Sequence, residues 1–281
     1  MKKLICICIS FFSVYLYGIN GVGAASVMEP NFEVKLLLKS EQVINDKGKL
    51  NKSVLEYFQA SSSSEKINVQ FLDTNKKDLY DAGWTARIRK KESEQDFELT
   101  YKKRYPIQND DIQEALVLAK KEGFDQKSNN YEAQIDWGFE KKTLSISNKK
   151  SRQAKGYGLL QLPGEKEARK MIIDKLPDKM NNWLYKNWAE NILNQSHIFG
   201  PVLVDRYQGK YNKLNTDIEV WPLDHTGNKE EDYIVEVSFK VDNEKTARKQ
   251  RELFIQALQK QGWLLPKDSL KTELILKGKS M

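Results

Sequence analysis

Several short segments of the chain alternate between apolar and polar residues. The longest covers residues 233–241, where Glu236, Ser238 and Lys240 alternate with apolar side chains. A period of two is typical of β-strands with one buried face. The pattern therefore predicts an antiparallel sheet with one apolar and one polar face. The other segments of this kind are residues 31–36, 84–89, 97–102, 131–137, 143–147 and 216–220.

Segments with helical periodicity lie between the predicted strands. One long stretch begins at Pro163-Gly164 and is interrupted near Pro177, and in it Leu184, Trp188 and Ile192 recur at every fourth position. We interpret residues 149–195 as a helical insertion and residues 26–281 as a single α+β domain. The shorter predicted helices cover residues 52–59, 110–122 and 243–261.

Charged residues gather on the polar faces of the predicted strands. Arg87 and Arg89 share one face, as do Glu33 and Lys35 on the first strand. This polar face could meet bulk water, or the sheet could curl into a barrel with a polar lumen and with helices on its apolar outside. The mixture of positive and negative side chains favours the barrel, because a lumen that binds an anion together with a metal needs both. Residues 131–137 carry acidic side chains as well, but these belong to no motif and are interpreted as structural.

The first 25 residues have the pattern of a signal peptide. Lys2 and Lys3 precede an apolar run over residues 4–17, and small residues around Ala24 and Ala25 offer a cleavage site. The run is shorter than the roughly 20 apolar residues of a membrane-spanning helix. We therefore expect a secreted or periplasmic protein with no membrane anchor after cleavage.

Composition excludes several kinds of site. The chain has only two cysteines and two histidines, too few for a disulfide scaffold, a four-cysteine zinc site or a histidine-built metal centre. Its 46 Lys and Arg against 39 Asp and Glu give a formal net charge of +7. The basic residues alternate with acidic ones and form no stripe, which argues against nucleic acid as a partner.

Several of these segments, taken in order, resemble the CYTH superfamily, also called the triphosphate tunnel metalloenzymes. The block Phe71-Leu72-Asp73-Thr74, followed by Gly83 and Arg87-Ile88-Arg89, is the most specific part of the likeness. The resemblance runs from about residue 31 to residue 276 and does not explain the helical insertion. Its other parts are Asn31-Phe32-Glu33-Val34-Lys35, Leu99-Thr100-Tyr101-Lys102, Arg206, Asp217-Ile218-Glu219, Glu236-Val237-Ser238 and Ser269-Leu270-Lys271-Thr272-Glu273-Leu274.

The resemblance implies an antiparallel β-barrel tunnel that binds inorganic triphosphate, polyphosphate or an organic triphosphate. Arginine and lysine suit such anions, and carboxylate oxygens suit the Mg²⁺ or Mn²⁺ that the family uses. Matched to the family motif, the phosphate contacts would be Lys35, Arg87, Arg89, Lys102 and Arg206. The catalytic and metal-binding carboxylates would be Glu33, Glu219 and Glu236.

Two positions depart from the family pattern. Asn31 and Ser238 stand where the family has glutamates, so that two carboxylates are lost from the predicted metal site. Three functions follow as hypotheses: an exported metal-dependent phosphohydrolase, a barrel that binds polyphosphate without catalysis, and a structural or partner-binding protein that retains only the fold.

Overall fold

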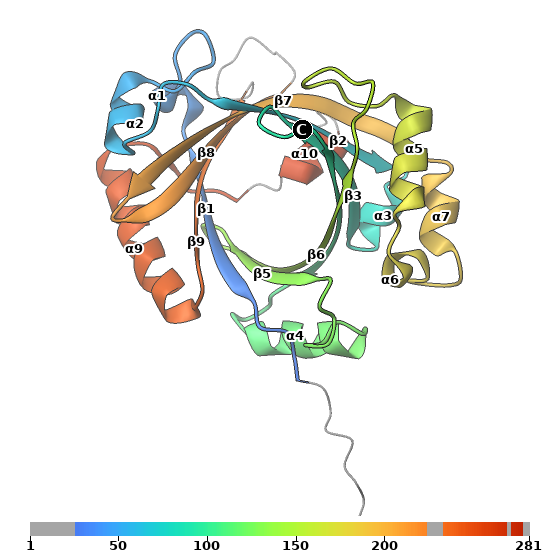
Figure 1. The fold of residues 1–281 in the computed structure, drawn as a ribbon. Coiled ribbons are helices and arrows are strands. Elements are labelled where there is room, and N and C mark those ends of the chain that lie inside the picture. The colour runs from blue at the N-terminus through green and yellow to red at the C-terminus, as the bar shows by residue number, and fades with distance from the viewer. Residues whose placement is uncertain (1–25, 224–232, 269–270, 278–281) are drawn as a thin grey trace, which may run out of the picture.

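A mixed β-sheet that closes on itself forms the centre of the structure (Figure 1). The computed structural model describes residues 26–223, 233–268 and 271–277. The predicted signal peptide lies outside these residues. In the described part of the chain the barrel strands are β1 (Asn31–Leu38), β2 (Glu65–Asp73), β3 (Trp84–Lys91), β4 (Phe97–Pro106), β5 (Glu132–Trp137), β6 (Lys142–Arg152), β7 (His197–Tyr211), β8 (Leu214–Pro222) and β9 (Tyr233–Val241).

Pairing of β1 with β9 closes the barrel, whose strand order is β1-β5-β6-β4-β3-β2-β7-β8-β9. The predicted α+β barrel is therefore confirmed. One detail differs: β1 and β5 run parallel, from Asn31 opposite Gln134 to Val34 opposite Trp137, which makes the barrel mixed. Beyond this pairing the same edge of β1 is joined by the short β10 (Leu264–Leu265).

Helices cover the outside of the barrel on several sides (Figure 1). Their N-termini include two with clear caps, where Asp111 and Asn243 accept backbone hydrogen bonds from Glu114 and Thr246. The described helices are α1 (Ser40–Val43), α2 (Lys52–Tyr57), α3 (Asp78–Asp81), α4 (Ile112–Lys121), α5 (Glu165–Asp174), α6 (Asp178–Asn181), α7 (Trp188–Leu193), α9 (Glu244–Lys260) and α10 (Lys271–Lys277).

The main hydrophobic core lies between these helices and the outward face of the sheet. Trp84 of β3, which is fully buried, meets Trp183 edge to face with 5.4 Å between ring centroids. On the other side of the barrel Phe254 of α9 packs against Phe58 and Phe239. The apolar halves of the period-two strands thus face the helices, and their polar halves face the lumen.

Several sequence-based boundaries need correction. β2 and β7 lie in segments where no strand was predicted, and β6 extends to Arg152, into the range expected to be helical. Leu184 belongs to no helix and is 65% exposed, because the chain turns between α6 and α7. The four-residue repeat that suggested one helix there therefore does not describe a buried helix face.

Helix α10 differs from the others because it lies within the outline of the barrel (Figure 1). Its Leu276 packs in a separate apolar cluster with Ile67, Val69 and Phe71 of β2. These three side chains also line the lumen. One wall of the lumen is therefore apolar and is covered by the C-terminal helix.

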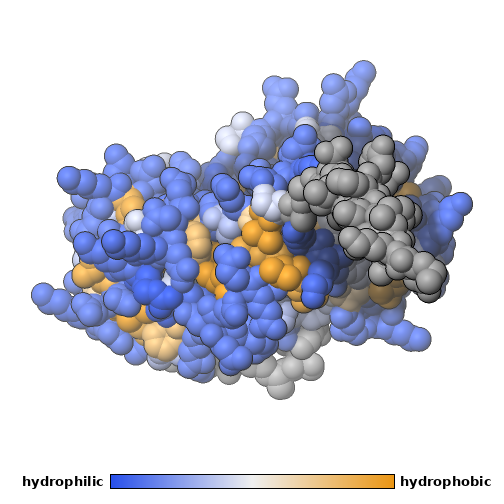
Figure 2. Space-filling model, turned by 90° about the horizontal axis from the view of Figure 1, so that it is seen from below, coloured by the Kyte–Doolittle hydropathy of each residue, from blue (hydrophilic) through white to orange (hydrophobic). Residues whose placement is uncertain are grey.

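The face of the molecule seen from below is mostly polar (Figure 2). Figure 2 shows one face, from below, on which hydrophilic residues surround small apolar patches. None of the helices in the described ranges has both the length and the apolarity that crossing a membrane requires.

Asp268 fixes the chain just before α10. Its carboxylate accepts hydrogen bonds from the backbone N–H groups of Phe139, Glu140 and Lys141, at 2.5, 2.8 and 2.8 Å. The approach requires glycine at position 138, since a Cβ there would lie 2.0 Å from Asp268 Oδ1. The β5–β6 turn is thereby tied to the C-terminal segment.

We expect Asp268→Ala to lower the free energy of unfolding by about 2 kcal/mol, because three backbone donors lose a charged acceptor. Thermal unfolding followed by circular dichroism measures the change. Lys267→Ala, next to it on the exposed surface, is the control and should leave the melting temperature nearly unchanged. Equal stability of the two variants would contradict the assigned role of Asp268.

Candidate functional site

A polar cavity of about 280 Å³ occupies the lumen and is lined by residues from all nine barrel strands and from α10. Nine lysine and arginine residues and six aspartate and glutamate residues line it. The positive excess is thus concentrated where an anion would be enclosed. All eight site residues predicted from the sequence lie in this lining, namely Glu33, Lys35, Arg87, Arg89, Lys102, Arg206, Glu219 and Glu236.

Arg87 and Arg89 of β3 share one carboxylate on the neighbouring strand. Arg87 Nη2 lies 3.1 Å from Glu98 Oε1 and 3.0 Å from Thr100 Oγ1, and Arg89 Nη2 lies 2.6 Å from Glu98 Oε2. Burial favours the neutral carboxyl, but the two guanidinium groups outweigh it and lower the pKa of Glu98 to about 2. Burial and the neighbouring Arg89 lower the pKa of Arg87 to about 10. Arg87 therefore remains charged at neutral pH.

Four lumen arginines keep a buried donor without an acceptor in the described part of the chain. The Nε atoms of Arg87, Arg89, Arg104 and Arg206 are all buried and have no hydrogen-bond partner there. Each leaves part of a guanidinium group desolvated, which costs about 1–3 kcal/mol unless an acceptor is supplied. These donors belong to three different strands around the cavity.

Lys102 of β4 makes no hydrogen bond or ion pair within the described residues. Burial lowers its pKa to about 7; Asp136 opposes this shift, and the charges of Arg104, Lys35 and Arg87 add to it. A lysine with this pKa is half charged at neutral pH, and an added anion would favour its charged form.

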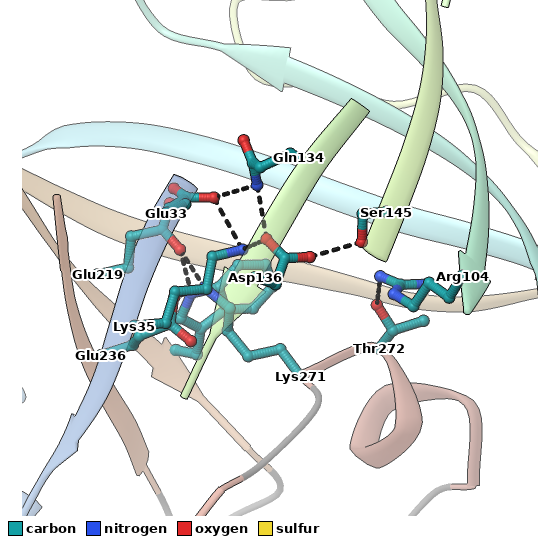
Figure 3. Close-up of polar contacts among 11 residues, drawn as sticks. Glu33, Lys35, Arg104, Gln134, Asp136, Ser145, Glu219, Glu236, Lys271 and Thr272 are labelled. Carbon is teal, nitrogen blue, oxygen red and sulfur yellow. Dashed lines mark hydrogen bonds and ion pairs between the residues drawn. The ribbon is translucent and has the colours of Figure 1, made fainter. Parts of the chain in front are cut away.

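Lys35 of β1 lies between two carboxylates (Figure 3). Its Nζ is 2.9 Å from Glu33 Oε2 and 2.8 Å from Asp136 Oδ1. Gln134 donates to both carboxylates, and Ser145 donates to Asp136. Burial disfavours the charge on Lys35, but Asp136 and Glu33 outweigh it and hold its pKa well above the usual value.

Lys271 of α10 forms a second group of the same kind (Figure 3). Its Nζ contacts Glu219 and lies 2.9 Å from Glu236 Oε1. Trp221 donates to Glu219 at 2.8 Å, and its ring centroid lies 4.6 Å from the same Nζ. Burial raises the pKa of Glu236, whereas Lys271 lowers the pKa of Glu219 to about 2 despite its burial.

The predicted metal ligands do not fit a divalent cation in this arrangement. Lys35 contacts Glu33, and Lys271 contacts both Glu219 and Glu236, so an ammonium group already lies against each carboxylate. Among the described residues no three acidic, histidine or cysteine side chains are grouped for a metal ion. Asn31 and Ser238, the two departures from the family pattern, also line the cavity.

Seven charged residues of the lumen are not among the eight site residues predicted from the sequence, namely Arg104, Glu132, Asp136, Lys149, Asp217, Lys240 and Lys271. Arg104 lies two positions after Lys102, and Asp136 lies on the polar face of its strand, so strand periodicity could have indicated both. Lys240 could have been found in the same way, two positions after Ser238. Strand periodicity could not have indicated Lys271, because this residue lies on helix α10.

Comparison with known proteins shows only distant likenesses. No family model and no curated protein matches the chain. Two similar solved structures are a proposed adenylyl cyclase from Hippeastrum with a dominant triphosphatase activity (12% identity, 89% of this chain and 96% of that chain, TM-score 0.49) and a proposed adenylate cyclase from Bacillus halodurans (13% identity, 87% and 97%, TM-score 0.46). A third is a proposed adenylate cyclase from Vibrio parahaemolyticus (12% identity, 87% and 98%, TM-score 0.42). At these values they do not show the function of this chain.

We expect Lys102 to titrate near pH 7, so that the lumen gains a positive charge as the pH falls through this value. NMR of ¹³Cε-labelled lysine should show one resonance with this midpoint. The resonance should be missing from Lys102→Gln, whereas the lysine at position 35 should stay protonated throughout. A midpoint close to the ordinary lysine value of 10.5 would contradict the burial argument.

Proposed function

We propose that the barrel binds a linear polyphosphate anion, such as inorganic triphosphate, inside its lumen. The observation that carries this proposal is the set of four buried arginine Nε donors without an acceptor around one cavity. Phosphate oxygens are suitable acceptors, because guanidinium groups bind them through charged, forked hydrogen bonds. The resemblance to the triphosphate tunnel family supports the same ligand class.

The distribution of the basic groups favours a chain of phosphates over a single one. Arg87 and Arg89 come from β3, Lys102 and Arg104 from β4, and Arg206 from β7. A ligand that satisfies donors on three strands must offer oxygens at several points. Inorganic triphosphate, longer polyphosphate and the triphosphate group of an organic molecule all share this chemistry.

We expect Arg87→Ala to weaken the binding of tripolyphosphate at least about tenfold, since the loss of a hydrogen bond to a charged group costs about 1.5–3 kcal/mol. Isothermal titration calorimetry of the protein lacking residues 1–25 measures this. The matched control is Arg248→Ala, an arginine that, like Arg87, is ion-paired, in its case with Asp110 and Glu244, but that lies outside the barrel on α9. Absence of binding to the unaltered protein would contradict the proposed function.

Hydrolysis of the bound anhydride is a second candidate. It is favoured by Glu236, a buried carboxyl that faces the same cavity and whose pKa burial raises. A carboxylate with a raised pKa is better suited than an ordinary one to accept a proton from an attacking water. The residues as arranged do not fit a divalent cation, so we derive no step through Mg²⁺ or Mn²⁺.

If the protein is a hydrolase, phosphate release from tripolyphosphate should fall at least about 100-fold in Glu236→Ala, the lower range for loss of a general base. The assay is run with Mg²⁺, with Mn²⁺ and in excess chelator, and Glu132→Ala is the matched acidic control from the lumen. Tight binding without phosphate release in any condition would leave a binding protein and exclude the hydrolase.

Export is a further proposal that rests on the sequence pattern of residues 1–25. Expression of the full chain in a bacterial host, followed by N-terminal sequencing of the exported protein, tests it. Cleavage after residue 24 or 25 is the expected result.

A further inference from the structure

Two carboxylates of the lumen, Glu219 and Glu236, require a cation between them. Glu219 of β8 and Glu236 of β9 lie directly opposite each other in the strand register, and both face the cavity. Like charges at directly opposed positions of a sheet destabilise it, and burial strengthens the repulsion. A divalent metal ion would relieve this repulsion in a site built for metal. In this chain the charge comes from Lys271.

Lys271 is well held at this place. Its ammonium contacts Glu219 and Glu236 and lies near the face of the Trp221 ring, a favourable position for a cation. Burial disfavours its charge, but the two carboxylates outweigh burial and raise its pKa above the ordinary lysine value. The group therefore carries a permanent positive charge.

Described residues on both sides of Lys271 make anchoring contacts. Three residues earlier, Asp268 is held by the backbone N–H groups of the β5–β6 turn. Five residues later, Leu276 is buried in the apolar wall formed by Ile67, Val69 and Phe71. The next residue, Thr272, accepts a hydrogen bond from Arg104 at 3.4 Å. The ammonium group is thus delivered by an anchored helix and not by a loose surface chain.

We propose that Lys271 is a built-in cation that replaces a divalent metal ion, so that polyphosphate binds in this lumen without metal. This inference rests on the proposed function. An ammonium group has three N–H donors, and within the described residues two are directed to Glu219 and Glu236. The third has no hydrogen-bond acceptor among the described residues, so that it can donate to a phosphate oxygen in the way that a metal ion would coordinate one.

The test compares the unaltered protein with Lys271→Met in calorimetric titrations. The unaltered protein should bind tripolyphosphate in excess chelator and should not bind Mn²⁺ alone. Lys271→Met should bind tripolyphosphate at least about tenfold more weakly in chelator, for loss of a charged contact. It should gain Mn²⁺ binding, because the two carboxylates are left without a cation, and Mn²⁺ should raise its melting temperature.

Two further variants serve as controls. Lys149→Met removes a lumen lysine that contacts a single carboxylate, Glu132, and should gain no Mn²⁺ binding. Lys271→Arg keeps the positive charge and should also bind no Mn²⁺. Circular dichroism checks that each variant is folded.

The outcomes separate the two proposals. If the unaltered protein binds tripolyphosphate in no condition, the proposed function fails. If it binds tripolyphosphate only with metal, or binds Mn²⁺ alone, the proposed function stands and the role of Lys271 is wrong. A folded Lys271→Met protein that gains no Mn²⁺ binding also overturns that role. If Lys271→Met does not fold, the role of Lys271 is still tested by the unaltered protein, because metal-dependent binding of tripolyphosphate or binding of Mn²⁺ alone would overturn it.

Discussion

Closure of the sheet with its polar face inward is the constraint on which the rest of the structure depends. The pairing of β1 with β9 places fifteen ionisable side chains around one cavity of about 280 Å³. In such a space a charge loses much of its hydration and must be compensated by a neighbour or titrate away. Lys35 and Lys271 each form ion pairs with two carboxylates, and Glu98 forms ion pairs with two arginines. Lys102, which contacts no carboxylate among the described residues, has a lowered pKa instead.

The described residues do not provide enough hydrogen-bond acceptors for the positively charged groups of the lumen. Five of the six carboxylates that line the lumen form an ion pair with a lysine, whereas the buried Nε atoms of four arginines have no acceptor among the described residues. Such groups weaken a fold unless a ligand satisfies them. Folding has already removed water from these arginine donors. An anion that enters the lumen therefore gains hydrogen bonds without the free-energy cost of desolvating them, so that what lowers the stability of the fold raises the affinity for the ligand. The lumen is therefore better prepared for an anion than for a cation.

The sequence was informative where strand periodicity and burial agree. Alternation over residues 84–89 and 97–102 predicted both the strands and the inward faces of Arg87 and Lys102. The rule fails at β2, because its inward residues Ile67, Val69 and Phe71 are apolar, whereas Asn68 and Gln70 on its outward face are polar. Asn68 and Gln70 of β2 donate to the carbonyl groups of Leu160 and Pro163, which lie between β6 and α5. That inversion depends on α10 entering the lumen, a tertiary contact that local periodicity cannot reveal.

Helix α10 adds a positive charge to the lumen through Lys271, and this charge bears on the two positions that depart from the family pattern. Asn31 and Ser238 remove negative charge from positions where the resemblance leads one to expect carboxylates, and both line the cavity. A lumen that holds a lysine in place of a divalent ion carries one positive charge fewer, so it also needs fewer carboxylates to hold its cation. The absence of carboxylates at Asn31 and Ser238 and the presence of Lys271 are thus consistent with each other. Together they fit a tunnel in which the protein itself supplies the positive charge that binds the anion.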